Sequence, residues 1–232
     1  PMNIVSLIDH AILHPTADDS ELTKGCELAA QLEVATVCVK PYMVGKAAQL
    51  LHGSPVGVGT VIGFPHGGNT TIVKSAEAER ACLDGAEELD MVVNVGRVLA
   101  EDWEYVQADI AAVQIIARSH KALLKVIFET DYLRDSHIVK LCDLCSELQV
   151  DFVKTSTGFG FTKRESGDYN YTGATIEHIQ LMLDNVDGSV QVKASGGIRT
   201  YEYAKQLSDM GVTRLGTSAS QAIADGGVGE GY

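Results

Sequence analysis

The sequence has few of the features that mark secreted, membrane-bound or nucleic-acid-binding proteins. Its 232 residues include only five cysteines, an odd number thinly spread, which argues against a disulfide framework and favours a reducing compartment. No apolar run reaches the ~18 residues that a membrane span needs. The opening PMNIVSLIDH lacks the basic and apolar segments of a signal peptide. We therefore expect a cytoplasmic protein.

Basic residues are also scarce relative to acidic ones, and this limits the partners. The net charge of −13 argues against nucleic acid or an anionic membrane as the main partner. Hydrophobic residues make up 45% and charged residues 21% of the chain, a balance that permits a sizeable core. No low-complexity linker divides the chain, so we interpret residues 1–232 as one domain whose glycine-rich end, roughly 225–232, is a flexible tail.

What recurs along the chain is a β-branched run followed by an amphipathic helical stretch. The expected strands are 8–13, 35–40, 56–64, 89–95, 123–130, 152–156, 190–195 and 214–217. The expected helices are 20–33, 42–51, 70–84, 102–120, 135–149, 174–186, 201–210 and 218–224. This alternation predicts a (β/α)8 TIM barrel. A doubly wound open sheet has the same alternation and is the alternative.

Glycines follow the last two expected strands, in Ser195–Gly197 and in Gly216–Ser218. In a barrel, the loops after strands seven and eight often bind a phosphate. Glycine exposes backbone N–H groups there, and a following helix N-terminus favours an anion. Either loop alone is explained by a tight turn, but the two together predict a phosphate site.

Two lysines stand near the ends of the neighbouring strands that precede these loops. Lys154 lies in DFVKTSTGFGF and Lys193 in VQVKASGGIRT. Burial and like charge both disfavour protonation, so one lysine should have a lowered pKa and a free amine that attacks an aldehyde. Each lysine alone is better explained as a strand-end residue that reaches solvent or pairs with a carboxylate. The pair beside a phosphate site favours Schiff-base chemistry.

An acidic residue lies inside the strand segment ELDMVVNVG. Asp90 is unfavourable there unless it has a partner. Lys125 of LLKVIFET is a candidate partner in a purely structural ion pair, and the alternative makes Asp90 an acid/base that moves protons for the lysine. Cys38 in VCVKP either lines the pocket or packs in the core. The sequence does not decide between the two roles of Asp90 or between the two positions of Cys38.

The sequence resembles the deoxyribose-phosphate aldolase family in motifs that follow the family's order over nearly the whole chain. These motifs are IDHAILHP, VCVKP, VGVGTVIGFP, ELDMVVNVG, LKVIFET, FVKTSTGF, VKASGGIRT and RLGTS. The resemblance implies a class I aldolase, a lyase of carbohydrate degradation. Such an enzyme reversibly cleaves 2-deoxy-D-ribose 5-phosphate to D-glyceraldehyde 3-phosphate and acetaldehyde through a lysine Schiff base. It implies no metal and no organic cofactor, because the protonated imine accepts the electrons.

Matched residue by residue, the resemblance makes Lys154 the Schiff-base lysine, Lys193 the second lysine and Asp90 the proton-relaying aspartate. Lys125 and Cys38 are accessory candidates. The terminal Tyr232 either assists proton transfer at the acetaldehyde carbon from a mobile tail or belongs to a disordered end.

The resemblance also implies which residues bind the phosphate and shows where this sequence departs from the family. The phosphate-binding residues of the family correspond here to Gly196, Gly197, Gly216 and Ser218. Phe159 stands where some relatives have a lysine, and the segment GFTKRESGDYNYTGAT is longer than usual. Its Lys163 and Arg164 either reach the substrate phosphate or are solvated. These departures put substrate affinity in doubt more than the reaction.

Other classes of protein share parts of this pattern. A non-catalytic sugar-phosphate-binding barrel would keep the glycine loops without using two facing lysines, and a barrel isomerase or decarboxylase would transfer protons without an imine. A related Schiff-base aldolase with another acceptor is the nearest rival. We expect a sugar phosphate and acetaldehyde as ligands, and a homodimer or larger homo-oligomer, because barrels commonly associate.

Overall fold

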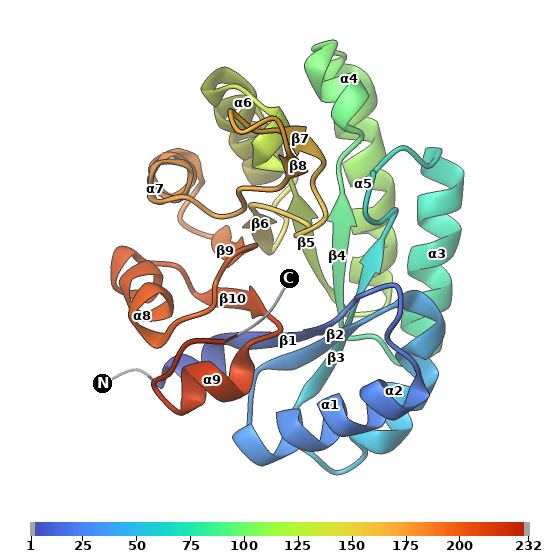
Figure 1. Ribbon diagram of the computed structural model, residues 1–232. Helices are drawn as coiled ribbons and strands as arrows, with labels where there is room; N and C mark the ends of the chain where they lie inside the picture. Colours follow the sequence, from blue (N-terminus) through green and yellow to red (C-terminus); the bar gives the residue numbers. More distant parts are fainter. Residues whose placement is uncertain (1–2, 230–232) are drawn as a thin grey trace.

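Parallel strands alternate with helices along residues 3–229, which are the part of the chain that the computed structural model describes (Figure 1). The strands of the barrel are β1 (Ile8–Ile12), β2 (Thr36–Val39), β3 (Gly57–Ile62), β4 (Glu88–Val92), β5 (Leu123–Ile127), β6 (Phe152–Lys154), β9 (Gln191–Ser195) and β10 (Arg214–Thr217). They close in the order β1-β10-β9-β6-β5-β4-β3-β2. Because β1 pairs with both β2 and β10, the predicted (β/α)8 barrel is confirmed and the open sheet is excluded.

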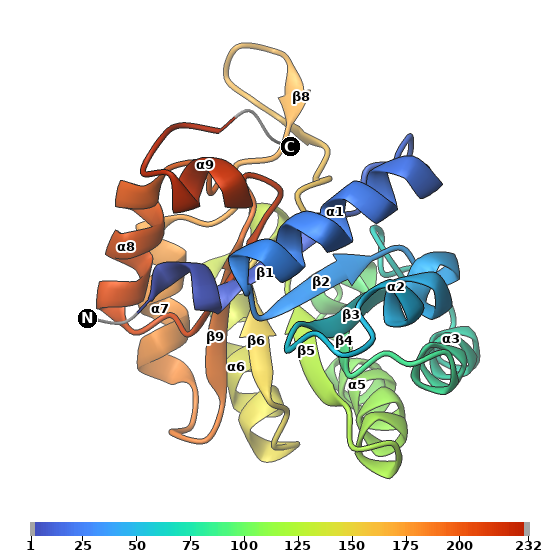
Figure 2. The ribbon, with the colours of Figure 1, turned by 90° about the horizontal axis from the view of Figure 1, so that it is seen from below.

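The helices surround the strands, as Figures 1 and 2 show. They are α1 (Asp19–Leu32), α2 (Val44–Leu50), α3 (Thr71–Leu83), α4 (Val95–Leu99), α5 (Trp103–Ser119), α6 (Asp135–Glu147), α7 (Ile176–Asn185), α8 (Tyr201–Met210) and α9 (Ser220–Ala224). Short 3₁₀ helices span Ile4–Leu7, Pro41–Met43 and Thr130–Tyr132. Among these residues, no helix has the length and apolar character to cross a membrane.

Helix α5 shows how the sequence specifies the outer layer. Val106, Ile110, Val113 and Ala117 recur at helical spacing and are all buried against the barrel. Asp102 precedes the helix and its carboxylate accepts a hydrogen bond from the Tyr105 backbone N–H at 3.3 Å. One apolar stripe and one cap therefore fix both the register and the start of this helix.

Two segments at the carboxyl ends of strands differ from the sequence-based expectation. The last helix begins at Ser220 and not at 218, because the Thr217 hydroxyl accepts a hydrogen bond from the Ala219 N–H at 2.9 Å and holds a turn there. The fourth strand ends at Val92 and not at 95, because the Asn94 side chain caps the short helix α4. In both places a polar side chain forms a hydrogen bond to nearby backbone and shortens the helix or strand that the sequence predicts.

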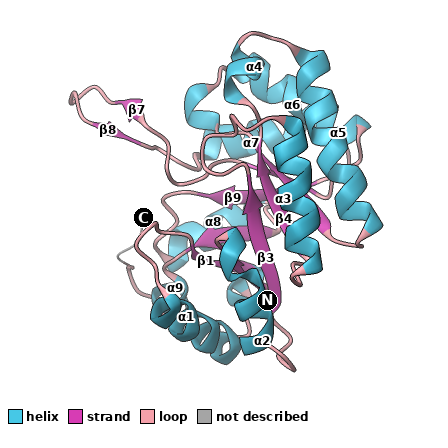
Figure 3. Ribbon diagram, turned by 90° about the vertical axis from the view of Figure 1, so that its right-hand side faces the viewer, coloured by secondary structure: helices cyan, strands magenta, loops and turns pink. Residues whose placement is uncertain are grey.

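The long segment after β6 forms a β-hairpin. Its strands, β7 (Thr162–Lys163) and β8 (Tyr169–Asn170), pair antiparallel, and the hairpin projects from the barrel (Figure 3). The Phe161 and Tyr169 rings stack with their centroids 4.5 Å apart. Lys163 and Arg164 are exposed, and the Arg164 guanidinium donates to the Tyr171 carbonyl at the hairpin's base. This placement favours the solvated interpretation of the two cations.

The described chain ends beside the loop that follows β9. Val228 forms an isolated antiparallel bridge with Thr200, and the Gly229 N–H donates to the Arg199 carbonyl at 2.8 Å. The candidate Tyr232 lies outside the described residues, so its role stays a prediction.

Candidate active site

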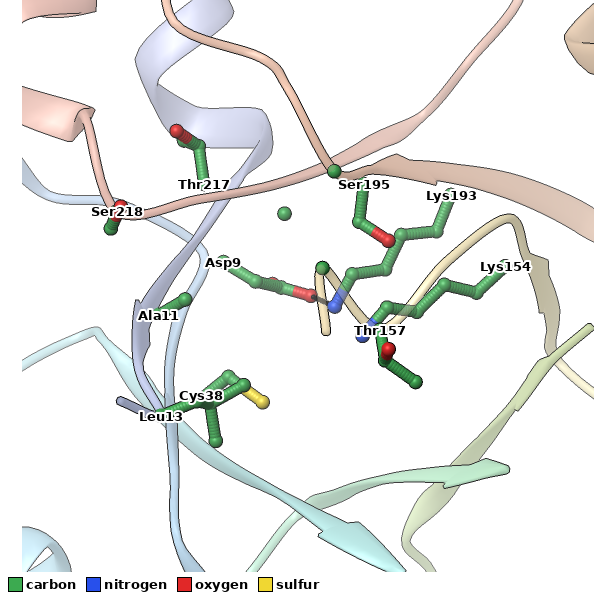
Figure 4. Close-up of a pocket in the computed structure, with 13 residues that line it drawn as sticks. Asp9, Ala11, Leu13, Cys38, Lys154, Thr157, Lys193, Ser195, Thr217 and Ser218 are labelled. Carbon is green, nitrogen blue, oxygen red and sulfur yellow. Dashed lines mark hydrogen bonds and ion pairs between the residues drawn. The ribbon is translucent and has the colours of Figure 1, made fainter. Parts of the chain in front are cut away.

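A polar pocket opens at the carboxyl ends of the barrel strands. Lys154, Lys193 and Asp9 lie at its base, and Cys38 and Thr157 form part of its wall (Figure 4). The pocket encloses about 30 Å³, which is enough for an ordered water between the polar groups. In a TIM barrel this end of the strands carries the catalytic groups.

The two lysines converge on one aspartate. Lys154 ends β6 and is the register partner of Lys193 in β9, so the expected adjacency of the two strands is confirmed. The Asp90 Oδ2 atom accepts hydrogen bonds from both amines, each at 2.7 Å. All three side chains are buried, with Asp90 beneath the amines and 0% exposed. The structure thus brings together the three residues that the resemblance assigns to catalysis.

The pair of Asp90 with Lys125 is also present. The Lys125 amine donates to Asp90 Oδ1 at 2.9 Å, across neighbouring strands β4 and β5. Since Asp90 also contacts Lys154, this ion pair does not exclude the acid/base interpretation. One carboxylate can hold a structural cation on one oxygen and serve the amines on the other.

Asp9 is a member of this site that the residue-level reasoning missed. Its carboxylate accepts a hydrogen bond from the Lys193 amine at 2.5 Å and another from the Thr36 hydroxyl at 2.7 Å. Asp9 is fully buried in β1 and also contacts Lys125 and Arg214. The signal was available, because IDHAI places an acid inside an apolar strand, as ELDMV does for Asp90.

Ion pairs join these groups into one interior network, with Glu88 as a third carboxylate. Its members are the carboxylates of Asp9, Glu88 and Asp90 and the cations of Lys125, Lys154, Lys193 and Arg214. With every group ionised, four cations face three carboxylates, and one excess positive charge is buried. A buried network is most stable when its charges are matched, so one cation should give up its proton.

Lys154 is the cation that holds its proton least. Among residues 3–229 its amine has one carboxylate within ion-pair distance, whereas Lys193 has two and Lys125 has three. Burial lowers the pKa of Lys154 most, and the Lys193 charge lowers it further, against the opposing effect of Asp90. Burial also acts on Lys193, but Asp9 and Asp90 outweigh it and raise the pKa of Lys193. Of the two amines, Lys154 therefore releases its proton more readily than Lys193.

Asp90 stays ionised in this arrangement. Burial alone would raise the pKa of its carboxyl, but Lys125, Lys154 and Lys193 together hold that pKa well below its usual range. The carboxylate is therefore available to accept hydrogen bonds from the neighbouring amines.

An apolar cluster lines the pocket on the side of strands β1 to β3. Leu13, Cys38 and Val61 are buried there, and Phe64 and Phe159 pack against them. Burial raises the pKa of the Cys38 thiol to about 11, so the thiol stays protonated and packs as a small apolar group. The structure satisfies both interpretations of Cys38, since it lines the pocket and belongs to a core cluster.

The predicted phosphate loops form the opposite rim. Gly196 and Gly197 follow β9 with φ of 89° and 78°, values that favour glycine. A Cβ on Gly196 would lie 2.9 Å from the Gly173 Cα, so this glycine also permits a close backbone approach. The Ser218 hydroxyl lies in the pocket wall and has no hydrogen-bond partner within residues 3–229. Its oxygen is thus a buried polar atom left unsatisfied by the described residues beside the predicted phosphate loop.

Gly216 has a second function in packing. It lies in β10, and a Cβ on it would meet the Ser195 Cβ at 2.8 Å and the Lys193 Cε at 3.2 Å. Glycine at this position therefore leaves room for the stem of Lys193 to run toward Asp90.

The described residues include no group of three or more His, Cys, Asp or Glu side chains arranged to hold a metal ion. Cys142 and Cys145, whose CDLC spacing resembles a zinc knuckle, are both buried in the hydrophobic core on α6. They pack there as small apolar side chains.

A closed (β/α)8 barrel with buried amines and a polar pocket at its strand ends defines the chain as a member of the barrel enzymes. Comparison with known proteins gives the particular group. The model of the DeoC/LacD family aldolases matches residues 4–221. The chain belongs to this aldolase family.

Individual relatives agree with this assignment. The chain is 46% identical to a deoxyribose-phosphate aldolase of Clostridium perfringens over 98% of its own length and 96% of the relative's. A putative deoxyribose-phosphate aldolase from Coccidioides immitis has a similar structure, with a TM-score of 0.88 at 40% identity, covering 97% of this chain and 86% of that one. A deoxyribose phosphate aldolase from Aeropyrum pernix, described as having a unique tetrameric structure, has a TM-score of 0.85 at 28% identity, covering 96% of this chain and 89% of that one.

Proposed function

We propose that this protein is a deoxyribose-phosphate aldolase that cleaves 2-deoxy-D-ribose 5-phosphate to D-glyceraldehyde 3-phosphate and acetaldehyde, with Lys154 as the Schiff-base residue. The observation that carries the assignment of Lys154 is the charge balance of the interior network. Three carboxylates match three cations only when one amine is neutral, and Lys154 is the amine with a single carboxylate partner among the described residues. A neutral amine at the base of the pocket is the nucleophile that imine formation needs.

Cleavage begins with attack of the Lys154 amine on the C1 aldehyde of the sugar. The carbinolamine then loses water, and proton transfers accompany both steps. Asp90 is placed to handle these protons, because its Oδ2 atom touches the amines of both Lys154 and Lys193. The water-sized space above the amines accommodates the hydroxyl that leaves.

The protonated imine then accepts the electrons of the C2–C3 bond. Bond cleavage converts the imine to an enamine, while C3 becomes the aldehyde of glyceraldehyde 3-phosphate. Protonation of the enamine carbon and hydrolysis of the imine release acetaldehyde and restore Lys154. The positive charge of Lys193 keeps the free amine available at the end of each cycle.

The rim opposite the apolar cluster holds the phosphate in this proposal. Gly196, Gly216 and Ser218 line one edge of the pocket and supply backbone groups and one hydroxyl there, whereas Gly197 is exposed and follows Gly196 in the same loop. Binding there fixes the distance between the C1 aldehyde and Lys154, which lowers the entropic barrier to attack.

Trapping of the imine tests the assignment of Lys154. The protein is incubated with acetaldehyde and borohydride, and the modified site is mapped by mass spectrometry. We expect an ethyl adduct confined to Lys154. An adduct on Lys193 would keep the aldolase but reverse the roles of the two lysines. The absence of a specific adduct would contradict the aldolase assignment and leave a phosphate-binding barrel.

Removal of one hydroxyl tests the phosphate site. Ser218→Ala is expected to raise KM for deoxyribose 5-phosphate roughly 10- to 100-fold, because a lost hydrogen bond to a charged group costs about 1.5–3 kcal/mol and each ~1.4 kcal/mol is tenfold. We expect kcat to change little. Unphosphorylated deoxyribose is the matched control, since its kcat/KM should not change. An equal loss for both sugars would place Ser218 outside the phosphate site.

The remaining assignments concern where the enzyme works and how it assembles. We place it in the cytoplasm, a location that its five free cysteines support. We also assign it a homo-oligomeric state, in keeping with the tetrameric relative. Fractionation of the source cells and light scattering on the purified protein test these two points.

A further inference from the structure

Glu129 is a buried carboxylate that the proposed Schiff-base steps do not use. It follows β5 and is only 2% exposed. Its backbone is left-handed, with φ of 58° and ψ of 62°, which is uncommon for a residue other than glycine. Backbone hydrogen bonds on both sides hold it there, from Phe128 N to the Lys154 carbonyl at 2.9 Å and from Thr130 N to the Thr155 carbonyl at 3.0 Å. An unusual backbone held this firmly suggests that the side chain's direction has a purpose.

The side chain of Glu129 is directed at Thr157. One carboxylate oxygen accepts the Thr157 backbone N–H at 3.1 Å, and the other accepts the Thr157 hydroxyl. The same hydroxyl accepts the Phe159 N–H at 3.0 Å. The hydroxyl hydrogen is thus committed to Glu129, and one lone pair remains for a further donor. Because Thr157 lines the catalytic pocket together with Lys154, a substrate bound there can supply that donor (Figure 4).

A second cavity lies on the other side of Glu129. It has a volume of about 230 Å³ and is lined by Pro65, His66, Val95, Glu129, Tyr132 and Phe159. Several waters fit in this space. Thr157 therefore faces the catalytic pocket, Glu129 faces the second cavity, and their hydrogen bond joins the two spaces.

We infer that Thr157 and Glu129 form a proton relay that serves the substrate's C3 oxygen, separate from the Asp90 group that serves the imine. This inference rests on the proposed function, because the C3 oxygen is the one that changes from hydroxyl to aldehyde in that reaction. The second cavity gives the proton an exit that does not pass the Schiff base. Burial raises the pKa of the Glu129 carboxyl against its hydrogen bonds from Thr157, which makes it a stronger base.

In the cleavage direction the step balances as follows. The C3 hydroxyl proton passes to the Thr157 oxygen as the Thr157 proton passes to Glu129. The electron pair of the broken O–H bond forms the new C3=O bond, and the C2–C3 pair forms the enamine double bond. The imine π electrons move to the Lys154 nitrogen. Glu129 then releases its proton to water in the second cavity, and in the synthetic direction every transfer is reversed.

Two half-reactions separate this relay from a purely structural role. Exchange of the acetaldehyde methyl protons in D₂O, followed by NMR, reports imine and enamine formation without the C3 oxygen. Cleavage of deoxyribose 5-phosphate reports the complete reaction. We expect Glu129→Gln and Thr157→Val each to lose roughly 100-fold in cleavage, the range of general acid–base catalysis, while exchange stays within about 3-fold of the unaltered protein.

The controls match the residue type and the backbone. Thr157→Ser keeps the hydroxyl and should retain most of the cleavage rate. Glu33→Gln changes another left-handed glutamate, with φ of 53°, that is exposed at the end of α1, and should alter neither rate.

Three results would overturn the relay. They are full cleavage by Glu129→Gln, a parallel loss of exchange and cleavage in both variants, and a loss in Thr157→Ser as large as in Thr157→Val. A lack of exchange in the unaltered protein would instead contradict the proposed Schiff-base function itself.

Discussion

Replacement of Lys154 by methionine is expected to lower the rate of deoxyribose 5-phosphate cleavage by about 10⁴- to 10⁶-fold, as loss of a covalent nucleophile does in other enzymes. The reason is that no imine can form at residue 154, and the remaining Lys193 amine is held by Asp9 and Asp90. The measurement is a coupled assay that detects released glyceraldehyde 3-phosphate.

The Lys154→Met variant should remain folded. Methionine keeps the apolar stem, and the interior network then holds three cations and three carboxylates, so no charge is left uncompensated. Lys205→Met is the matched control, because Lys205 lies exposed on α8 and pairs with Asp209. Retention of more than a tenth of the activity, or the same loss in the control, would disprove the assignment of Lys154.

Replacement of Lys193 by methionine is expected to reduce cleavage roughly 10³-fold at neutral pH, through the pKa of Lys154. Without Lys193, the three remaining cations match the three carboxylates only when Lys154 is protonated. The neighbouring charge that lowers the pKa of Lys154 is also gone. Lys154 should therefore keep its proton, and imine formation should become slow.

The pH profile shows the sign of this effect. The neutral fraction of Lys154 grows as pH rises through its pKa, so kcat/KM rises along that limb. In Lys193→Met the pKa is higher, so the limb moves to higher pH and the activity recovers in alkali. The pH dependence of imine trapping should move in the same direction. A loss that is equal at every pH would show that Lys193 acts by contact with the substrate and not by its charge.

The sequence specified the barrel because its periodicity survives in the structure. Apolar stripes such as that of α5 and β-branched runs such as 123–127 carry their own local signal. The pairing of Lys154 with Lys193 followed from topology, since Lys154 ends β6 and Lys193 is its register partner in the middle of the neighbouring strand β9. Strand ends were less accurate, because the Asn94 and Thr217 side chains redirect the backbone through bonds that periodicity does not detect.

The resemblance alone chose between the lysines, and the structure adds a physical reason for that choice. Lys154 and Lys193 have similar sequence surroundings, but their partners come from β1 and β4, which lie far away in the chain. Asp9 was not among the predicted site residues, although IDHAI places an acid inside an apolar strand just as ELDMV does. The link from Glu129 to Thr157 depends on a left-handed backbone that a glutamate in LKVIFET does not suggest.

In most TIM barrels the amino-terminal ends of the strands contribute to stability and the carboxyl-terminal ends carry the catalytic groups. In this barrel one ion network connects the stable end with the catalytic end. Arg214 and Glu88 are the first residues of β10 and β4, whereas Lys154 is the last of β6, and ion pairs connect them through the interior. A change that removes Arg214 or Glu88 at the stable end should therefore also shift the titration of the lysines at the other end, even though neither residue lines the pocket.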